Sequence, residues 1–117
     1  MEFVVAEDEV WFSVFDVLPR TEEATGDDFV REVRIPVSET EELHLSWDAT
    51  HRSVRFRHRR ESDIVVDVYR EHATLLTIEV RDTGPVVVAE YHANGFRGRT
   101  AVRFRPTFAL TDVLLQT

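Results

Sequence analysis

Apolar and polar side chains alternate along much of the chain, most clearly between residues 64 and 81. The even-numbered positions 64–68 and 76–80 are all Val, Leu or Ile, and the residues between them are polar except Val65. Period-two alternation of β-branched side chains is typical of half-buried strands. We therefore predict two strands joined by a turn at Glu71–Ala73, with Val68 opposite Leu76. A one-residue slip would bring Asp67 into the core, so the alternation specifies the register.

A third strand should follow the turn at residues 82–85, because Gly permits a positive φ and Pro cannot donate to a ladder. We place Val87 of this strand opposite Val80. Asn94-Gly95, the strongest short hairpin signal, then predicts a further return strand with a bulge at Gly98. In this register Val102 faces Ala89.

Other segments show the same pattern less strongly. In the hairpin 43–60 we expect Leu45 opposite Phe56 and Trp47 opposite Val54. Phe3–Ala6 is a short strand candidate, turned back by residues 7–9. Phe29–Val37 and Phe108–Leu115 read as strands, and a short helix stays open for each; the apolar side chains of the second segment are expected to be mostly buried.

Val10–Leu18 is apolar on both faces if it is extended. A strand of this kind is covered on both sides, lies centrally in a sheet, or pairs across a homodimer. In total we predict a mainly β, antiparallel fold of eight or nine short strands. It forms a β-sandwich or flattened barrel as one domain over residues 1–117.

Composition limits the cellular compartments and the classes of partner that fit the chain. The chain has no cysteine, which excludes disulfides and thiolate chemistry and fits a reducing compartment. No apolar run approaches the roughly 20 residues of a membrane helix, and the start lacks a basic signal segment. We therefore expect a cytoplasmic protein that has no membrane partner. The formal net charge of −8 makes nucleic acid an improbable partner.

The sequence carries no P-loop, GxGxxG, GxSxG or HExxH motif. Its five histidines show no i, i+2 or i, i+4 spacing, whereas a metal site needs three or four convergent ligands. We expect no metal, no cofactor and, on balance, no catalytic residue. Whether the chain is an enzyme stays open.

The first hypothesis is a non-catalytic binding module that works by surface complementarity, such as an immunity protein, an inhibitor or an accessory subunit. Arginines at every second position of one predicted strand form a stripe that suits an acidic protein surface, and two acidic segments suit a basic one. An ordinary solvated sheet face is the alternative explanation of the stripe. The candidate partner-binding residues are Glu22, Glu23, Asp27, Asp28, Glu41, Glu42, Arg55, Arg57 and Arg59.

Two further hypotheses belong to other classes. A barrel-type binder of a small ligand, or a small enzyme, would need a polar cavity. Tyr69, Glu79, Glu90 and Arg103 would line that cavity, with the two carboxylates available for acid–base chemistry. A homo-oligomeric structural domain would instead use Val10–Leu18 as its interface.

Overall fold

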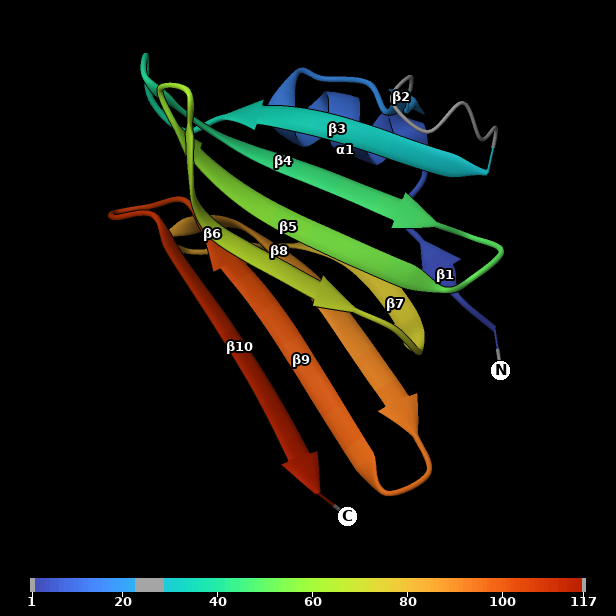
Figure 1. Cartoon of the computed structure of the whole chain (residues 1–117). Helices are drawn as coiled ribbons and strands as arrows, with labels where there is room; N and C mark the ends of the chain where they lie inside the picture. Colours follow the sequence, from blue (N-terminus) through green and yellow to red (C-terminus); the bar gives the residue numbers. More distant parts are fainter. Residues whose placement is uncertain (1, 23–28, 117) are drawn as a thin grey trace.

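The computed structural model describes residues 2–22 and 29–116, and two five-stranded sheets face each other in it (Figure 1). Sheet A has the strand order β1-β7-β8-β9-β10 and sheet B the order β2-β3-β4-β5-β6. The mainly β, antiparallel-rich fold is confirmed. The elements in chain order are β1 (Val4–Val5), α1 (Asp8–Phe15), β2 (Arg20–Thr21), β3 (Val30–Pro36), β4 (Glu41–Asp48), β5 (Ser53–Arg60), β6 (Asp63–Arg70), β7 (Ala73–Arg81), β8 (Gly84–Ala93), β9 (Phe96–Arg103) and β10 (Ala109–Gln116).

The core lies between the sheets and takes one face from each. Successive side chains of a pleated strand point to opposite faces, so every second side chain of each strand points into the core. Sheet B contributes residues such as Leu45 and Phe56, and sheet A residues such as Leu76 and Val87. The β4–β5 register matches the prediction, with Leu45 opposite Phe56 and Trp47 opposite Val54.

The predicted pairing of segments 64–70 and 74–81 is wrong. They form β6 and β7, and these strands belong to different sheets. β6 pairs with β5, which places Val68 opposite Phe56, and the chain crosses to sheet A at Glu71–His72. Alternation fixes which face of a strand is buried but not which strand lies beside it. The apolar side chains of β6 and β7 can therefore meet across the core instead of along one sheet.

The two hairpins of sheet A keep the predicted faces, but each register differs from the prediction by two residues. Val87 pairs with Ile78 instead of Val80, and with Val102 on its other side. Both turns are tighter than expected: residues 81 and 84 pair across one, and residues 93 and 96 across the Asn94-Gly95 turn. Val80 is left 74% exposed as a result.

The predicted bulge at Gly98 does not form. Gly98 pairs regularly with Tyr91, and a Cβ at this position would lie 2.4 Å from Leu114 Cδ2 and 3.0 Å from Tyr91 Cδ2. Gly98 thus serves the close approach of its neighbours across the ladder and not a change of register.

The segment Val10–Leu18 is largely helical, so its prediction as a strand is wrong. Asp8 and Glu9 in the first turn of α1 interact favourably with the helix dipole, and Asp16 ends the helix with φ = 60°. Trp11 and Phe15 are one turn apart and point the same way, and the Trp11 ring stacks on Trp47 at 5.6 Å between centroids. The two-sided strand on which the homodimer hypothesis depended is absent.

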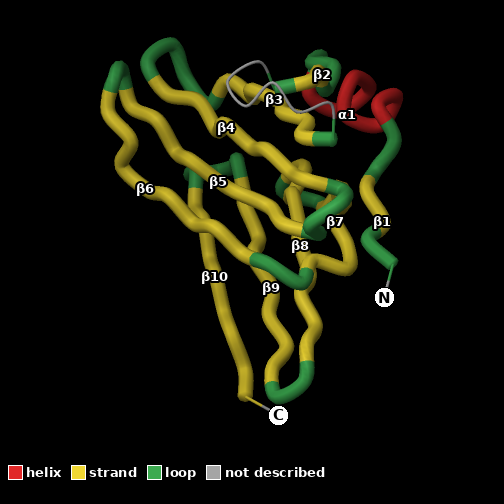
Figure 2. The backbone as a smooth tube through the Cα atoms, turned by 45° about the vertical axis from the view of Figure 1, so that its right-hand side comes forward, coloured by secondary structure: helices red, strands yellow, loops and turns green. Residues whose placement is uncertain are grey.

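Helix α1 lies beside β3, on the side of the sandwich opposite the edge strands β6 and β10 (Figure 2). Before it, β1 pairs in parallel with β7 and does not turn back as a hairpin. Phe29–Val37 and Phe108–Leu115 both contain strands, β3 and β10, which settles the helical alternative. The expected burial of β10 is wrong in part, because residues 113–115 are about half exposed.

A series of hydrogen-bonded side chains joins the two sheets beside their edge strands β6 and β10. Asp112 of β10 accepts hydrogen bonds from Thr100 Oγ1 at 2.6 Å and from Arg70, which reaches across from β6. Because the Thr100 hydroxyl donates to Asp112, Tyr91 must donate to Thr100, over 2.6 Å. Burial raises the pKa of the Tyr91 phenol, which therefore stays protonated. At the edge of the apolar layer, the buried hydroxyls of Tyr91 and Thr100 thus have hydrogen-bond partners.

The role of α1 predicts a matched pair of stability effects. Trp11→Ala removes a fully buried ring and its stacking on Trp47, so we expect a loss of about 3–5 kcal/mol in the free energy of unfolding. Phe12→Ala, one residue later and 52% exposed, should change it by less than about 0.5 kcal/mol. Urea denaturation measures both. Equal losses in the two variants would indicate the extended segment instead of the helix.

Candidate functional site

The outward face of sheet B carries many charged side chains. The same alternation that buries one side of β3, β4 and β5 places charged and polar side chains on the other. We call this surface the charged face. It comprises Arg20, Glu22, Glu32, Arg34, Glu42, His44, Ser46, Arg55, Arg57, Arg59, Asp67 and Tyr69.

Glu32 lies at the centre of one half of the charged face and is only 4% exposed. Its carboxylate contacts Arg20 Nη2 at 3.0 Å, His44 Nε2 at 3.1 Å and Arg34 Nε at 3.8 Å. Burial raises the pKa of the Glu32 carboxyl, but the hydrogen bonds with His44 and Arg20 outweigh burial and hold the pKa below its usual value. Glu32 is therefore ionised at neutral pH.

His44 is the buried neutral partner of this carboxylate. Burial lowers the pKa of the imidazole, and the nearby cations Arg34 and Arg57 lower it further, although the bond to Glu32 opposes them. The neutral ring must donate from Nε2 to the ionised Glu32, which leaves Nδ1 as an acceptor. His44 Nδ1 is buried and has no hydrogen-bond partner.

On the other half of the charged face, Arg55 and Asp67 form a bidentate ion pair. Arg55 Nε and Nη2 donate to the two carboxylate oxygens over 2.9 and 2.6 Å. The hydrogen bonds from Arg55 lower the pKa of Asp67, and the same bonds raise that of Arg55. Fork geometry of this kind fixes both side chains before any partner arrives.

Arg57 and Arg59 lie between these two groups without an acid of their own. No hydrogen bond or ion pair between described residues involves either guanidinium, and the Nε atom of each is buried and unpartnered. Burial lowers the pKa of Arg57, and the adjacent Arg55 and Arg59 lower it further, although the charges of Asp67 and Glu22 oppose them. The charged face therefore holds two partly desolvated cations side by side.

A hollow of about 420 Å³ surrounds the two arginines and Glu32. Its lining is Arg20, Glu22, Glu32, Arg34, His44, Arg57 and Arg59. A smaller hollow of about 220 Å³ adjoins it on the side of Arg55 and Tyr69. The charged face is thus concave and polar, with cations outnumbering anions in its larger hollow.

The structure brings together part of the predicted partner-binding set. Glu22, Glu42, Arg55, Arg57 and Arg59 all belong to the charged face. Glu41 points the other way from Glu42 and bonds His58 and Arg60 at the end of the sandwich. Glu23, Asp27 and Asp28 lie outside the described residues.

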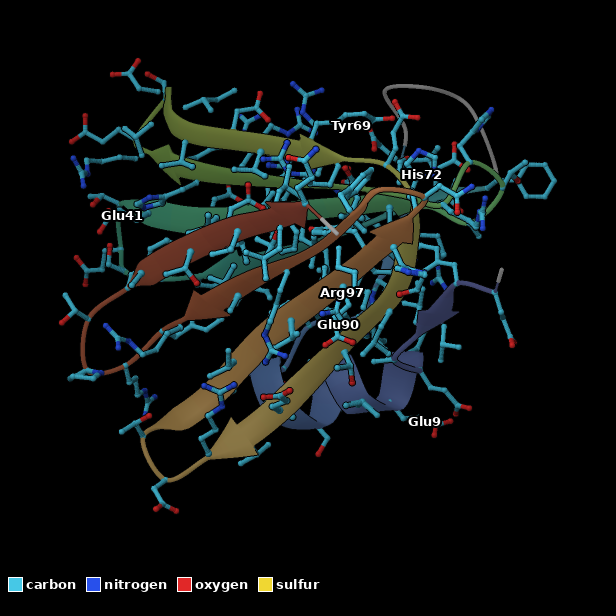
Figure 3. The ribbon with its side chains drawn as sticks, turned by 90° about the horizontal axis from the view of Figure 1, so that it is seen from below. Glu9, Glu41, Tyr69, His72, Glu90 and Arg97 are labelled. Carbon is cyan, nitrogen blue, oxygen red and sulfur yellow. The ribbon has the colours of Figure 1, made fainter. Side chains whose placement is uncertain are left out.

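The set predicted to line a cavity is divided between the sheets. Tyr69 lies on β6 of sheet B, whereas Glu90 projects from sheet A (Figure 3). Glu79 and Glu90 both contact Arg99, at 3.3 and 3.2 Å, and Arg103 bonds the Thr107 carbonyl. These four side chains therefore share no common cavity.

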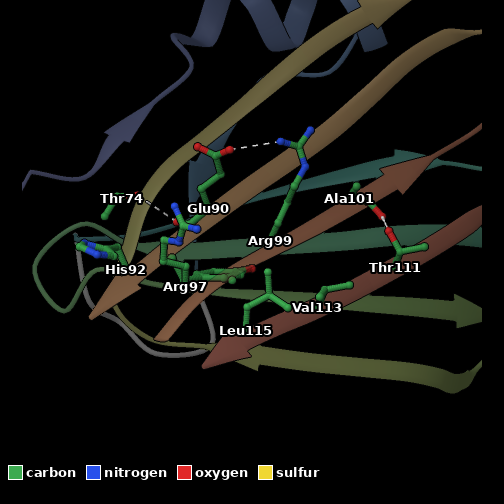
Figure 4. Close-up of a pocket in the computed structure, with 11 residues that line it drawn as sticks. Thr74, Glu90, His92, Arg97, Arg99, Ala101, Thr111, Val113 and Leu115 are labelled. Carbon is green, nitrogen blue, oxygen red and sulfur yellow. Dashed lines mark hydrogen bonds and ion pairs between the residues drawn. The ribbon is translucent and has the colours of Figure 1, made fainter. Parts of the chain in front are cut away.

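Sheet A has a hollow of its own, of about 460 Å³, on its outward face. Glu90 and Arg99 pair there above a wall that includes Val113 and Leu115 (Figure 4). Two arginines, Arg97 and Arg99, and one glutamate line it, so its excess of positive charge is smaller than that of the 420 Å³ hollow on sheet B.

Sequence reasoning missed Glu32, Arg34, His44 and Arg20 as members of the site. The signal that could have found them is the β3–β4 hairpin. Pairing across the bend at 37–40 sets Arg34 opposite His44. The β4–β5 pairing then sets His44 opposite Arg57. Among the described residues, no three His, Asp or Glu side chains gather as metal ligands. No helix within the described ranges has the length and apolar character needed to cross a membrane.

Comparisons with known proteins place the fold. No protein-family model and no curated protein matches the chain. A solved structure has a similar fold: a chain of the contact-dependent growth inhibition toxin–immunity protein complex from Klebsiella pneumoniae 342. The TM-score is 0.80, the match covers 97% of each chain, and 12% of the residues are identical. At this identity the likeness shows a shared fold.

The charged face predicts a pH-dependent contribution from Glu32. Its carboxyl pKa is depressed in the folded state, so its contribution to stability is present above the unfolded pKa, near 4.5, and is lost as pH falls through the folded pKa. Glu32→Gln should lower the free energy of unfolding by about 1–3 kcal/mol at pH 7. The difference from the original chain should close below about pH 4.5 in urea titrations.

Glu39→Gln is the matched control, because Glu39 is exposed in the bend before β4. It should change the free energy of unfolding by less than about 0.5 kcal/mol. A Glu32→Gln effect that is equal at pH 7 and pH 3 would contradict an ionised, hydrogen-bonded Glu32.

Proposed function

We propose that the chain is a non-catalytic inhibitor of the immunity type, which neutralises a protein toxin by binding it through the charged face. The observation that carries the proposal is the fold likeness, which spans 97% of both chains. The similar chain comes from a complex of a toxin and its immunity protein. We extend the role of the immunity protein to this chain.

The geometry of the charged face supports a binding role. Arg55 is held by Asp67, and Arg34 by Glu42 at 3.3 Å, so these long side chains are already ordered. Ordered side chains lose less conformational entropy when a partner docks, which favours affinity. A concave, preordered and charged surface suits recognition of another folded protein.

The formal net charge of −8 supports a partner with excess positive charge. Opposite net charges raise the rate of encounter, and the effect weakens as salt screens the charges. A fast association is of direct use to an inhibitor that must capture a toxin before it acts.

The proposal predicts growth rescue by this chain. The protein encoded beside it in the genome should arrest bacterial growth when expressed alone, and co-expression of this chain should restore growth. The two proteins should co-purify as a complex of fixed stoichiometry, measured by light scattering after gel filtration. The control is an unrelated soluble protein of similar net charge.

Growth arrest that persists beside a soluble, folded form of this chain would contradict the proposal. So would rescue without a complex, because the proposed mechanism is direct binding and not chemistry on the toxin or its target.

A further inference from the structure

Two cations on the charged face have no acceptor. Arg57 and Arg59 follow each other at every second position of β5, so both project from the same side of sheet B. Their Nε atoms are buried and unpartnered, and no hydrogen bond or ion pair between described residues uses their terminal nitrogens. Buried donors without acceptors are rare, because each costs free energy in the isolated protein.

Three of the four acids of the charged face are already engaged elsewhere, and the fourth, Glu22, lines the hollow near Arg57. Asp67 is held by Arg55, Glu42 by Arg34, and Glu32 by Arg20 and His44. The hollow itself is lined by four arginines against two glutamates and a buried histidine. The larger hollow of the charged face is therefore locally positive, although the whole chain is acidic.

Partial burial makes these arginines strong ligands for an anion. A guanidinium that has lost part of its water gains more from an opposite charge than a fully hydrated one, because the local dielectric is lower. Its planar fork matches the two oxygens of a carboxylate. Arg57 and Arg59 Cα atoms lie about 7 Å apart along the strand, so both forks can converge on one group between them.

We propose that the hollow at Arg57 and Arg59 is a carboxylate-binding site that receives an Asp or Glu side chain of the protein partner. This inference rests on the proposed function and specifies how the partner docks. The inserted carboxylate supplies the acceptor that the two arginines lack and fixes the orientation of the complex.

The surroundings favour one carboxylate over a phosphate backbone. Glu22 lines the hollow beside Arg57, and Asp67 lies opposite Arg57 on β6. A nucleic-acid strand would carry its next phosphates over these carboxylates and over a molecule of net charge −8. A carboxylate on a protein loop brings a single negative charge into the hollow. Basic groups of the partner around that carboxylate can then contact the acidic rim.

The site can be tested on the isolated chain by NMR. The probe is a blocked peptide, acetyl-Gly-Glu-Gly-Glu-Gly-amide, and the same peptide with Gln for Glu is its control. Backbone amide signals of β4 and β5 should shift saturably with the Glu peptide, with a dissociation constant in the millimolar range, and not with the Gln peptide.

Three variants make the test specific. Binding should weaken at least about tenfold in R57Q/R59Q and stay unchanged in R97Q/R103Q, which removes the same two charges from sheet A. R57K/R59K keeps both charges but lacks the forks, and should bind with intermediate strength. It also replaces R57Q/R59Q should that variant fail to fold, as judged by circular dichroism.

Three results would overturn the inference: equal binding of the Gln peptide, equal weakening in R97Q/R103Q, or tighter binding of a single-stranded DNA oligonucleotide at β5. The inference and the proposed function can fail separately. Growth rescue by R57Q/R59Q would contradict the carboxylate site but not the proposed inhibitor function. Specific peptide binding without growth rescue would contradict the inhibitor function but not the carboxylate-binding site.

Discussion

The packing of one apolar face of each sheet against the other is the constraint on which the molecule depends. Residues from both sheets and Trp11 of α1 form one buried cluster, and the ring of Trp11 stacks on Trp47 within it. Burial of such side chains contributes the main favourable free energy of folding. Only every second residue of each strand points into this layer. The remaining positions of sheet B therefore carry charges without weakening the core.

Those free positions are not equivalent, because the strand order decides which charges meet. Glu32 becomes a buried carboxylate only because β2 and β4 lie on either side of β3 and bring Arg20 and His44 to it. Asp67 reaches Arg55 only because β6 pairs with β5. After these pairings Arg57 and Arg59 are left over. The candidate site is therefore a result of how the acids are distributed, and the count of arginines alone would not reveal it.

Sequence reasoning predicted which face of most strands is buried, but it did not predict every strand pair. The β4–β5 register was predictable because a polar loop joins two strongly patterned strands, and it placed Arg55, Arg57 and Arg59 on one stripe. The partner of β6 was not predictable, because alternation is satisfied equally across a core or along a sheet. Residues 10–18 were ambiguous because a short apolar run fits both periods. Only the i, i+4 spacing of Trp11 and Phe15, together with acidic residues at the start, favoured the helix.

The acidic net charge and the positive hollow act over different distances, which removes their apparent conflict. At physiological ionic strength charges are screened beyond roughly 8 Å, so the net charge acts on a partner only as the surfaces come close, and it then favours a basic one. The hollow acts at contact, where water is displaced and a partly buried guanidinium discriminates strongly between an acid and any other group. A basic protein that offers one acid at the right point meets both conditions. A uniformly basic surface meets only the first, since it would leave Arg57 and Arg59 buried against like charge.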